Sequence, residues 1–458
     1  MAQRILQQRQ IDATEGTLWK QLTVFSLPIL LSQVFQQLYS IADTAIIGHF
    51  AQSTALAAVG ISSLLLSIIT NFFIGISTGI SVVIARFCGA KAHKELKECT
   101  QTVLLISILA GFLFTLIGIV SADLFLRLLG TPTDIMESTR SYLRICFWGV
   151  GAQLIYNMGN AILRAIGNTV APLIYLIVSS LVNLILDVVF IVVLHFDVQG
   201  AAAATIIAQW VSAILVLGKL MNGKFHFKAL KIHWRYLKSV FSLGIPTGVQ
   251  AIFMSISSLL IQTDINSFGS SAIAAMTVYA KLEGFLYFPM FSMGMAITAF
   301  VGQNMGANKL ERAKECVTKG IKMCLFISIV FSLFLLCFTQ QALSLFTKEQ
   351  AVIGYASRAM IFTFPFYWAY AINQVYIGGL RGMGRVLPPM VITFLSYCLF
   401  RVVWCRCLLP LHSSMDVIFA SYTASWFLML ICLKLYYHQE LRRYDGTTTP
   451  ILVKKNAA

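Results

Sequence analysis

The sequence predicts an all-α polytopic membrane protein with twelve transmembrane helices in two six-helix lobes. Three observations lead to this fold class: the composition, the apolar stretches and an internal repeat. Hydrophobic residues make up 58% of the 458 residues, charged residues only 11%, and the mean hydropathy is +0.79. Soluble domains typically carry about 25% charged residues. This chain therefore has too little polar surface to face water on all sides.

The apolar stretches are long enough to cross a hydrocarbon core about 30 Å thick. We expect transmembrane helices near residues 22–47, 55–85, 100–121, 139–161, 169–194, 200–220, 240–266, 272–301, 317–339, 353–378, 387–409 and 415–437.

The basic residues predict the orientation of these helices. Most of the 34 Lys and Arg residues lie in the two termini and in every second loop, whereas the other loops hold few, chiefly Arg127, Arg140 and Lys348. The positive-inside rule then places both termini in the cytoplasm, with the chain in the plasma membrane. It also explains the net charge of +16 without a nucleic-acid partner.

An internal repeat divides the chain into halves. The segment Leu163–Gly167 (LRAIG) recurs 217 residues later as Leu380–Gly384 (LRGMG), and the same shift carries Gly89-Ala90 to Gly306-Ala307. Each half holds six spans, so both halves insert the same way up. This predicts two lobes related by a pseudo-twofold axis along the membrane normal, with a cavity between them.

The repeat sets the expected domain boundaries. We expect an N-lobe at 1–220, a cytoplasmic linker at 221–239, a C-lobe at 240–437 and a cytoplasmic tail at 438–458. The basic and aromatic linker fits either an interfacial helix on anionic lipid or a solvated loop.

The candidate ion site starts from Asp187, an acid inside the apolar run Asn183–Leu194. A charge near the bilayer centre costs at least about 2.5–3.5 kcal/mol, and such residues usually face a cavity or a partner. Because desolvation disfavours the ionised form of a carboxyl group, Asp187 could exchange protons near neutral pH. Asn183 lies one turn earlier on the same face and could ligate a cation. The alternative is a structural acid bonded to a neighbouring helix.

A second acid, Asp43, belongs to a polar stripe on the first helix. Gln36, Ser40 and Asp43 follow at spacings of four and three residues, which indicates an internal, hydrated face. Pro28, earlier in this helix, frees a carbonyl group and allows a bend. In the alternative interpretation Asp43 lies at the outer membrane surface and ends the span.

Other polar residues extend the candidate site. The fourth span carries Asn157, Asn160 and Arg164 at intervals of about one turn. Asn160 could point inward beside Asn183, whereas Arg164 fits a snorkelling anchor at the cytoplasmic end of the span.

The second half has a different set of polar residues. It carries Gln262 and Glu283, for which pairing with a neighbouring helix is the favoured interpretation. In the alignment of the two halves, Trp404 occupies the position of Asp187, so the second half lacks this acid. One lobe is therefore expected to couple to the ion, while the other mainly shapes the cavity.

Enzymatic motifs are absent from the sequence. It has no P-loop, no HExxH, no GxSxG and no His cluster with metal-ligand spacing. We therefore expect no enzyme activity and no cofactor beyond a coupling ion, either H⁺ or Na⁺.

Several motifs together resemble one known family. Ala42-Asp43-Thr44, Asn160–Gly167, Asn183–Asp187 and Val301–Ala307 are similar to motifs of the multidrug and toxic-compound extrusion (MATE) transporters, and the resemblance covers nearly the whole chain. It implies a monomeric antiporter, surrounded by membrane lipid, that exports organic cations in exchange for H⁺ or Na⁺.

The resemblance also implies roles for individual residues. Asp43, Asp187, Asn183 and Asn160 would couple to the cation, with Arg164 nearby, and Asp43, Asn183 and Asp187 could hold Na⁺. By the resemblance, Pro28 would be a hinge of the first helix. From their polar side chains in apolar spans, we also expect six residues to line the substrate cavity: Gln36, Ser40, Asn157, Arg164, Gln262 and Glu283.

One departure favours a branch of the family that uses the N-lobe site. The NorM branch carries a further acid in the seventh span, and Pro246–Leu260 contains none. The alternative function is a lipid-linked oligosaccharide flippase of the same superfamily. Its pyrophosphate would need arginines inside the cavity, whereas Arg164 and Arg381 are expected at the cytoplasmic rim.

Overall fold

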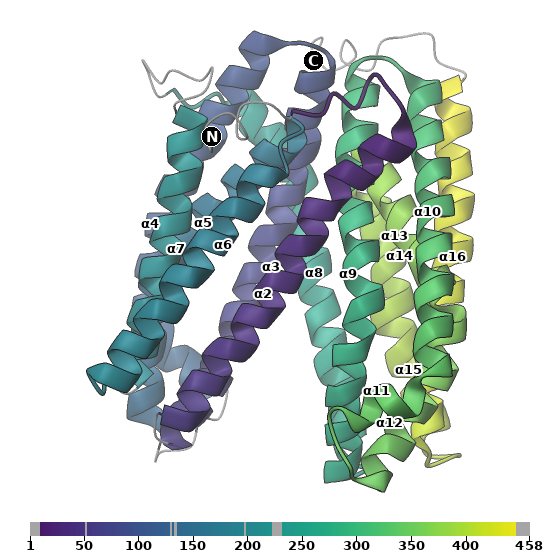
Figure 1. Ribbon diagram of the computed structural model, residues 1–458. Helices are drawn as coiled ribbons and strands as arrows, with labels where there is room; N and C mark the ends of the chain where they lie inside the picture. Colours follow the sequence, from purple (N-terminus) through teal and green to yellow (C-terminus); the bar gives the residue numbers. More distant parts are fainter. Residues whose placement is uncertain are drawn as a thin grey trace. The chain divides into compact units, whose positions relative to one another are not determined.

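Helices account for the regular structure of the computed structural model (Figure 1), which describes residues 10–50, 53–128, 131, 135–196, 198–221 and 231–445. Its elements are α2 (Leu18–Phe50), α3 (Ser53–Gly89), α4 (His93–Leu128), α5 (Met136–Ala165), α6 (Val170–Asp187), the π-helix η1 (Val188–Val193), α7 (Val198–Met221), α8 (Trp234–Asn266), α9 (Ser270–Gly306), α10 (Leu310–Cys337), α11 (Thr339–Ser344), α12 (Gln350–Thr363), the 3₁₀-helix η2 (Phe364–Phe366), α13 (Tyr367–Gly382), α14 (Leu387–Thr393), the π-helix η3 (Phe394–Leu399), α15 (Phe400–Leu408) and α16 (Met415–Asp445).

Every predicted span coincides with a helix or with a series of consecutive helices. The tenth span consists of α12, η2 and α13, and the eleventh of α14, η3 and α15. In the described part of the chain, 10 helices have the length and hydropathy needed to cross a membrane. The fourth and tenth spans fall outside that set: α5 carries several amide side chains, and Pro365 lies where the tenth span changes to a 3₁₀ turn. The twelve-helix prediction is confirmed.

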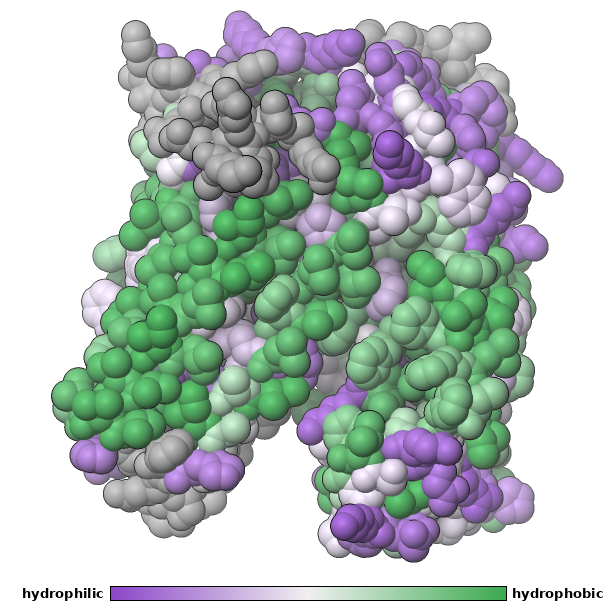
Figure 2. All heavy atoms as spheres, in the orientation of Figure 1, coloured by the Kyte–Doolittle hydropathy of each residue, from purple (hydrophilic) through white to green (hydrophobic). Residues whose placement is uncertain are grey.

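The helices extend beyond the apolar stretches that predicted them. The 37 residues of α9 correspond to a length of about 55 Å, which exceeds a hydrocarbon core of about 30 Å. Hydropathy marks only the part of a helix inside the lipid, whereas backbone hydrogen bonding continues into the polar region. In Figure 2 hydrophobic side chains cover the middle of the helices, and hydrophilic side chains gather at their ends.

The repeated sequence motifs are helix C-termini. Gly167 and Gly384 have φ angles of +92° and +72°, which glycine adopts without steric cost. In each case the amide of the next residue donates to a carbonyl five positions back: Asn168 to Leu163 at 2.9 Å, and Arg385 to Leu380 at 2.8 Å. This is the Schellman arrangement. The two halves therefore repeat in backbone conformation as well as in sequence.

The chain divides into two compact units. Unit 1 consists of Met1–Asp12 and Leu31–Gly248, and unit 2 of Ala13–Leu30 and Val249–Ala458. Thus α2 begins in unit 2 and continues in unit 1, while α8 begins in unit 1 and continues in unit 2. Both changes come two or three residues after a proline, Pro28 or Pro246. Residues 222–230 of the predicted linker lie outside the described residues.

In unit 1 the helix α5 packs against α3, α4 and α7, around buried residues such as Phe73 and Phe147. In unit 2 the helix α9 packs against α10, α12 and α13, and α16 covers α12 and α13. Each unit thus has its own core.

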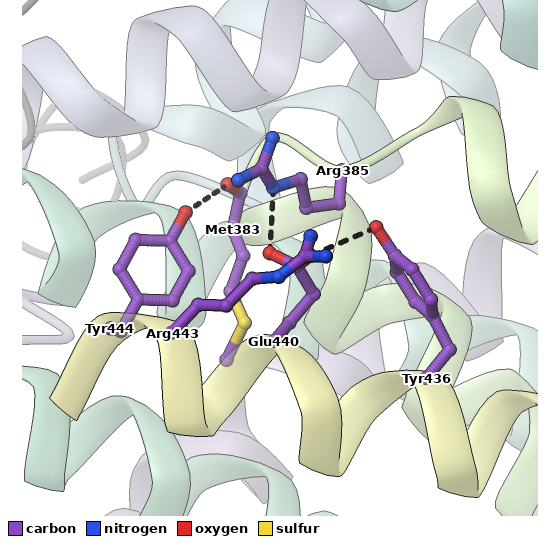
Figure 3. Close-up of polar contacts among 6 residues, drawn as sticks. All are labelled: Met383, Arg385, Tyr436, Glu440, Arg443 and Tyr444. Carbon is purple, nitrogen blue, oxygen red and sulfur yellow. Dashed lines mark hydrogen bonds and ion pairs between the residues drawn. The ribbon is translucent and has the colours of Figure 1, made fainter. Parts of the chain in front are cut away.

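The C-terminal end of α16 is fastened to the turn after α13 (Figure 3). The carboxylate of Glu440, which is fully buried, accepts hydrogen bonds from Arg385 Nε at 2.8 Å and Arg443 Nη1 at 2.7 Å. Tyr436 donates to the same carboxylate, and the Tyr444 hydroxyl donates to the carbonyl of Met383. This network holds the last helix against the repeated motif of the second half.

Candidate ion and substrate site

Two acids from different helices come together in unit 1. Asp187 is the last residue of α6 and is fully buried, immediately before the π-helix η1. Asp43 is half-buried on α2, and its carboxyl group lies within interaction range of the Asp187 carboxyl group. Among the described residues neither acid forms an ion pair. The pair therefore consists of two ionisable carboxyl groups that share one place in unit 1, with no basic side chain of the described residues in an ion pair with either.

Several polar atoms around this pair are buried without a hydrogen-bond partner in the described structure. They are Oδ1 of Asp43, both carboxyl oxygens of Asp187, both polar atoms of the Asn183 amide, and Oδ1 of Asn160. Leaving such a group unsatisfied costs about 1–3 kcal/mol. A proton, water or a small cation bound by these oxygens would recover that cost. The arrangement is thus suited to holding a small positive charge.

The carboxyl and amide oxygens also fit Na⁺ chemically, because hard cations prefer oxygen ligands. In the described part of the chain no group of three or more His, Cys, Asp or Glu side chains is placed to hold a metal ion. A Na⁺ ion at Asp43, Asn183 and Asp187 therefore stays a prediction that depends on the amide oxygen.

Tyrosines and a cysteine that the sequence analysis missed adjoin the acids. Tyr39 interacts with both carboxyl groups, and Tyr142 and Cys146 of α5 interact with Asp43. Tyr39 lies one helical turn before Asp43, so its spacing could have identified it. Aromatic rings attract organic cations, and both phenols lie within electrostatic range of Asp43.

The other predicted residues of unit 1 take varied positions. Gln36 and Ser40 are exposed on α2. Asn157 is half-buried, and its Nδ2 donates to the carbonyl of Gln153 at 2.9 Å, so this amide is satisfied by its own helix.

Farther along α5, Asn160 and Arg164 are near Tyr156. Asn160 is 4% exposed and interacts with the Tyr156 hydroxyl, and Arg164 lies within electrostatic range of the same hydroxyl. Pro28 is buried within α2, in the part of this helix that belongs to unit 2.

The predicted residues of the second half belong to unit 2, whereas the two acids belong to unit 1. Gln262 donates from Nε2 to Oδ1 of Asn266 at 2.9 Å, a pairing within its own helix. Glu283 accepts a hydrogen bond from the Tyr367 hydroxyl at 3.4 Å. A buried arginine nearby, Arg401, was missed by the sequence analysis, although a single charge inside an apolar span is the same signal that identified Asp187.

Comparisons with known proteins agree with this division into halves. A family model described as MatE matches residues 28–189 and 246–406. The chain is 29% identical to the probable multidrug resistance protein YoeA of Bacillus subtilis, over 84% of this chain and 85% of that protein. It is 27% identical to the probable multidrug resistance protein NorM of Thermotoga maritima, over 82% of each chain.

A solved structure shares the fold. The match is a MOP superfamily transporter from Pyrococcus furiosus, with a TM-score of 0.88 and 21% identity, covering 96% of this chain and 99% of that chain. At this identity the likeness concerns the fold.

Proposed function

Because this chain belongs to the MatE family of multidrug transporters, we propose that it exports organic cations across the plasma membrane in exchange for H⁺ or Na⁺. The observation that carries this proposal is the pair Asp43 and Asp187 in unit 1, with its buried and unpartnered oxygens. A neutral substrate would not need two ionisable carboxyl groups inside an apolar helix bundle.

In the proposed mechanism the organic cation and the inorganic cation compete for the same carboxyl groups. With Asp187 and Asp43 ionised, the site attracts an organic cation, and the rings of Tyr39 and Tyr142 add cation–π attraction. When the site opens to the outside, H⁺ or Na⁺ neutralises the carboxylates and the organic cation leaves. Asn183 and Asn160 would supply neutral oxygen ligands for the inorganic cation. The exchange needs the site to face each side of the membrane in turn.

The available gradients are sufficient for this exchange. One pH unit is worth about 1.36 kcal/mol per proton, and 100 mV about 2.3 kcal/mol per charge moved. In a one-for-one exchange of H⁺ for a monovalent organic cation no net charge moves, so one pH unit alone supports a concentration ratio of about tenfold. The potential adds to this ratio only when two protons, one for each carboxyl group, are exchanged per organic cation.

We further propose Pro28 as a hinge of α2. Its ring removes one backbone hydrogen bond, and the helix passes from unit 2 to unit 1 three residues later. The position of Pro246 in α8 supports the same role in the second half.

The test is ethidium efflux from proteoliposomes, with pH and Na⁺ gradients imposed separately. Asp187→Asn keeps the shape but removes the ionisable group, and we expect at least a tenfold loss of gradient-driven efflux. Asp123→Asn is the matched control, because Asp123 is a partly exposed acid of the same unit that pairs with Arg140 and Arg144. Retained efflux in Asp187→Asn would remove this acid from the mechanism.

A lipid-linked oligosaccharide flippase is not favoured. The relatives described above are named as multidrug resistance proteins. The two carboxyl groups of the unit 1 site would repel a pyrophosphate group whenever either of them is ionised.

A further inference from the structure

The end of α16 extends beyond the apolar stretch that predicts it. The sequence predicts a span at 415–437, whereas α16 continues to Asp445, about two turns farther. Four exposed side chains follow each other on one face at spacings of four, three and four residues: Ile431, Leu435, His438 and Arg442. This face therefore changes from apolar to basic at the level where the helix leaves the hydrocarbon core.

An open hollow with a volume of about 380 Å³ lies at this change of polarity. We call it the α16 hollow, and its lining residues are Leu435, His438, Gln439, Arg442 and Arg443. Leu435 is 68% exposed and supplies the apolar edge, whereas the other four side chains carry hydrogen-bond donors. None of the described residues that line the hollow is acidic.

The charges around the α16 hollow do not balance. Glu440 is fully buried, and its carboxylate accepts hydrogen bonds from Arg385 and Arg443 (Figure 3). The side chains of these two arginines are 45% and 58% exposed, so one buried carboxylate is shared by two partly exposed guanidinium groups. Arg442 is exposed and forms no ion pair within the described part of the chain. The hollow is thus left with an excess of positive charge.

We propose that the α16 hollow binds the headgroup of one anionic phospholipid, with its phosphate on Arg442 and an acyl chain along Leu435. Guanidinium groups bind phosphate oxygens through paired, charge-assisted hydrogen bonds. Under the orientation predicted from the basic residues, this end of α16 meets the cytoplasmic leaflet, where anionic lipids attract basic side chains. The inference goes beyond the proposed transport function and does not depend on it.

Two other occupants fit the α16 hollow less well. A free phosphate ion would use Arg442 but would gain nothing from the exposed Leu435 beside it. Residues 446–458 of the chain carry Lys454 and Lys455 and no acidic side chain, so like charges would keep this segment from the arginines. An anionic lipid matches both the apolar and the basic part of the hollow.

The test measures binding of phosphatidylglycerol, labelled with a fluorophore on one acyl chain, to the purified full-length protein in an uncharged detergent. We expect unlabelled phosphatidylglycerol to displace the probe at a concentration at least about tenfold lower than phosphatidylcholine, because charge-assisted hydrogen bonds are among the stronger ones. Inorganic phosphate at millimolar concentration should leave the probe bound. These competition measurements use the wild-type protein and need no variant.

Variants then locate the site. Arg442→Gln should weaken probe binding about tenfold, and Arg442→Lys, which keeps the charge, should weaken it less. Lys94→Gln is the matched control, because Lys94 is an exposed basic residue of α4 and its loss changes the net charge equally. We expect this control to bind the probe as the wild type does.

Three outcomes would overturn the proposal. Equal losses in Arg442→Gln and Lys94→Gln would show attraction by net charge without a site. Phosphatidylcholine that competes as well as phosphatidylglycerol would rule out recognition of the anionic headgroup, and displacement by millimolar phosphate would assign the hollow to a free anion. Since these measurements need no transport, they are independent of the ethidium assay, whose failure would instead refute the proposed function.

Discussion

At the scale of single residues, the environment of the Asn183 amide favours a role in cation binding over a structural role. Its side chain is 1% exposed, and neither polar atom has a hydrogen-bond partner in the described structure. Replacing an unsatisfied buried amide with an apolar side chain of similar size removes a penalty of about 1–3 kcal/mol. We therefore expect Asn183→Leu to raise the thermal unfolding midpoint while lowering cation affinity about tenfold, the equivalent of about 1.4 kcal/mol.

Gln250→Leu is the opposite control for this experiment. Gln250 is 3% exposed on α8, its Nε2 donates to Thr393 Oγ1 at 2.7 Å, and its Oε1 accepts from Arg381 Nη2 at 2.8 Å. Losing these bonds should cost about 1–3 kcal/mol of stability and therefore lower the unfolding midpoint. If Asn183→Leu behaved in the same way as Gln250→Leu, Asn183 would be a structural amide and not a cation ligand.

The residues of the site differ in how readily the sequence predicts them. Asp187, Asn183 and Asp43 are polar residues in apolar helices, and the energetic cost of that placement identifies them. Tyr142 and Cys146 carry no such signal, because aromatic and thiol side chains are common in apolar cores. Only the folded structure, which places Tyr142 and Cys146 of α5 within electrostatic range of Asp43, identifies them. Gln36 and Ser40 share the polar stripe of Asp43 but are exposed, since a helical stripe does not fix how wide a buried face is.

At the scale of helices, the close approach of α3 and α8 in unit 1 depends on glycine. A Cβ atom added to Gly75 would overlap the backbone of α8 at Gly248, and the Thr247 hydroxyl donates to the Gly75 carbonyl at 2.7 Å. Gly60 lies on the same helix with nothing near its missing Cβ. We expect Gly75→Ala to lower the unfolding midpoint in detergent, because the two backbones must separate.

Gly60→Ala is the matched variant for this prediction. At an open helical position alanine is favoured over glycine by about 1 kcal/mol, so Gly60→Ala should leave the midpoint unchanged or raise it. Equal responses of the two variants would show that α3 and α8 do not pack closely in the membrane protein.

A second helix-scale feature is the docking of the segment Ala13–Gly16 onto unit 2. Arg312 of α10 donates to the carbonyls of Ala13, Glu15 and Gly16 at 3.0, 2.7 and 2.8 Å. The side chains of Gln303 and Asn304 bind the amide and carbonyl of Ala13, each at 3.0 Å. The motif Val301–Ala307 thus forms part of the surface that binds the segment leading into α2.

Arg312→Ala should free this segment. Hydrogen bonds from a charged donor contribute about 1.5–3 kcal/mol each, so we expect faster hydrogen exchange over residues 13–21 with little change in global unfolding. Lys314→Ala, which removes an i,i+3 surface pair with Glu311 on the same helix, should change exchange very little. Unchanged exchange in Arg312→Ala would show that the segment is held by other contacts.

The helices themselves also show what sequence periodicity cannot supply. Apolar stretches predict where a span lies, because lipid requires a run of hydrophobic side chains. They do not distinguish an α-helix from the π-helical turns of η1 and η3 or the 3₁₀ turn of η2, since all of these bury the same side chains. The π-turn after Asp187 lies at the candidate site, where such irregularities are common.

At the scale of the whole molecule, the distribution of basic residues makes the orientation in the membrane testable. Lys94 is exposed in the first turn of α4, within a stretch of sequence rich in Lys. Ser413 is exposed between α15 and α16. Basic loops are retained on the cytoplasmic side during insertion. Lys94 is therefore expected inside the cell and Ser413 outside it.

Cysteines introduced one at a time at these two positions test this orientation. The chain used for the test has serine in place of the exposed Cys337 and Cys407 and of the half-buried Cys88 and Cys432. A membrane-impermeant maleimide added to intact cells should label Ser413→Cys and not Lys94→Cys, and after permeabilisation it should label both. The result bears on mechanism, because the direction in which an antiporter works depends on which end of the helices meets the cytoplasm. If Lys94→Cys alone were labelled in intact cells, the chain would have the opposite orientation to the one predicted. The ion gradient would then drive organic cations inward.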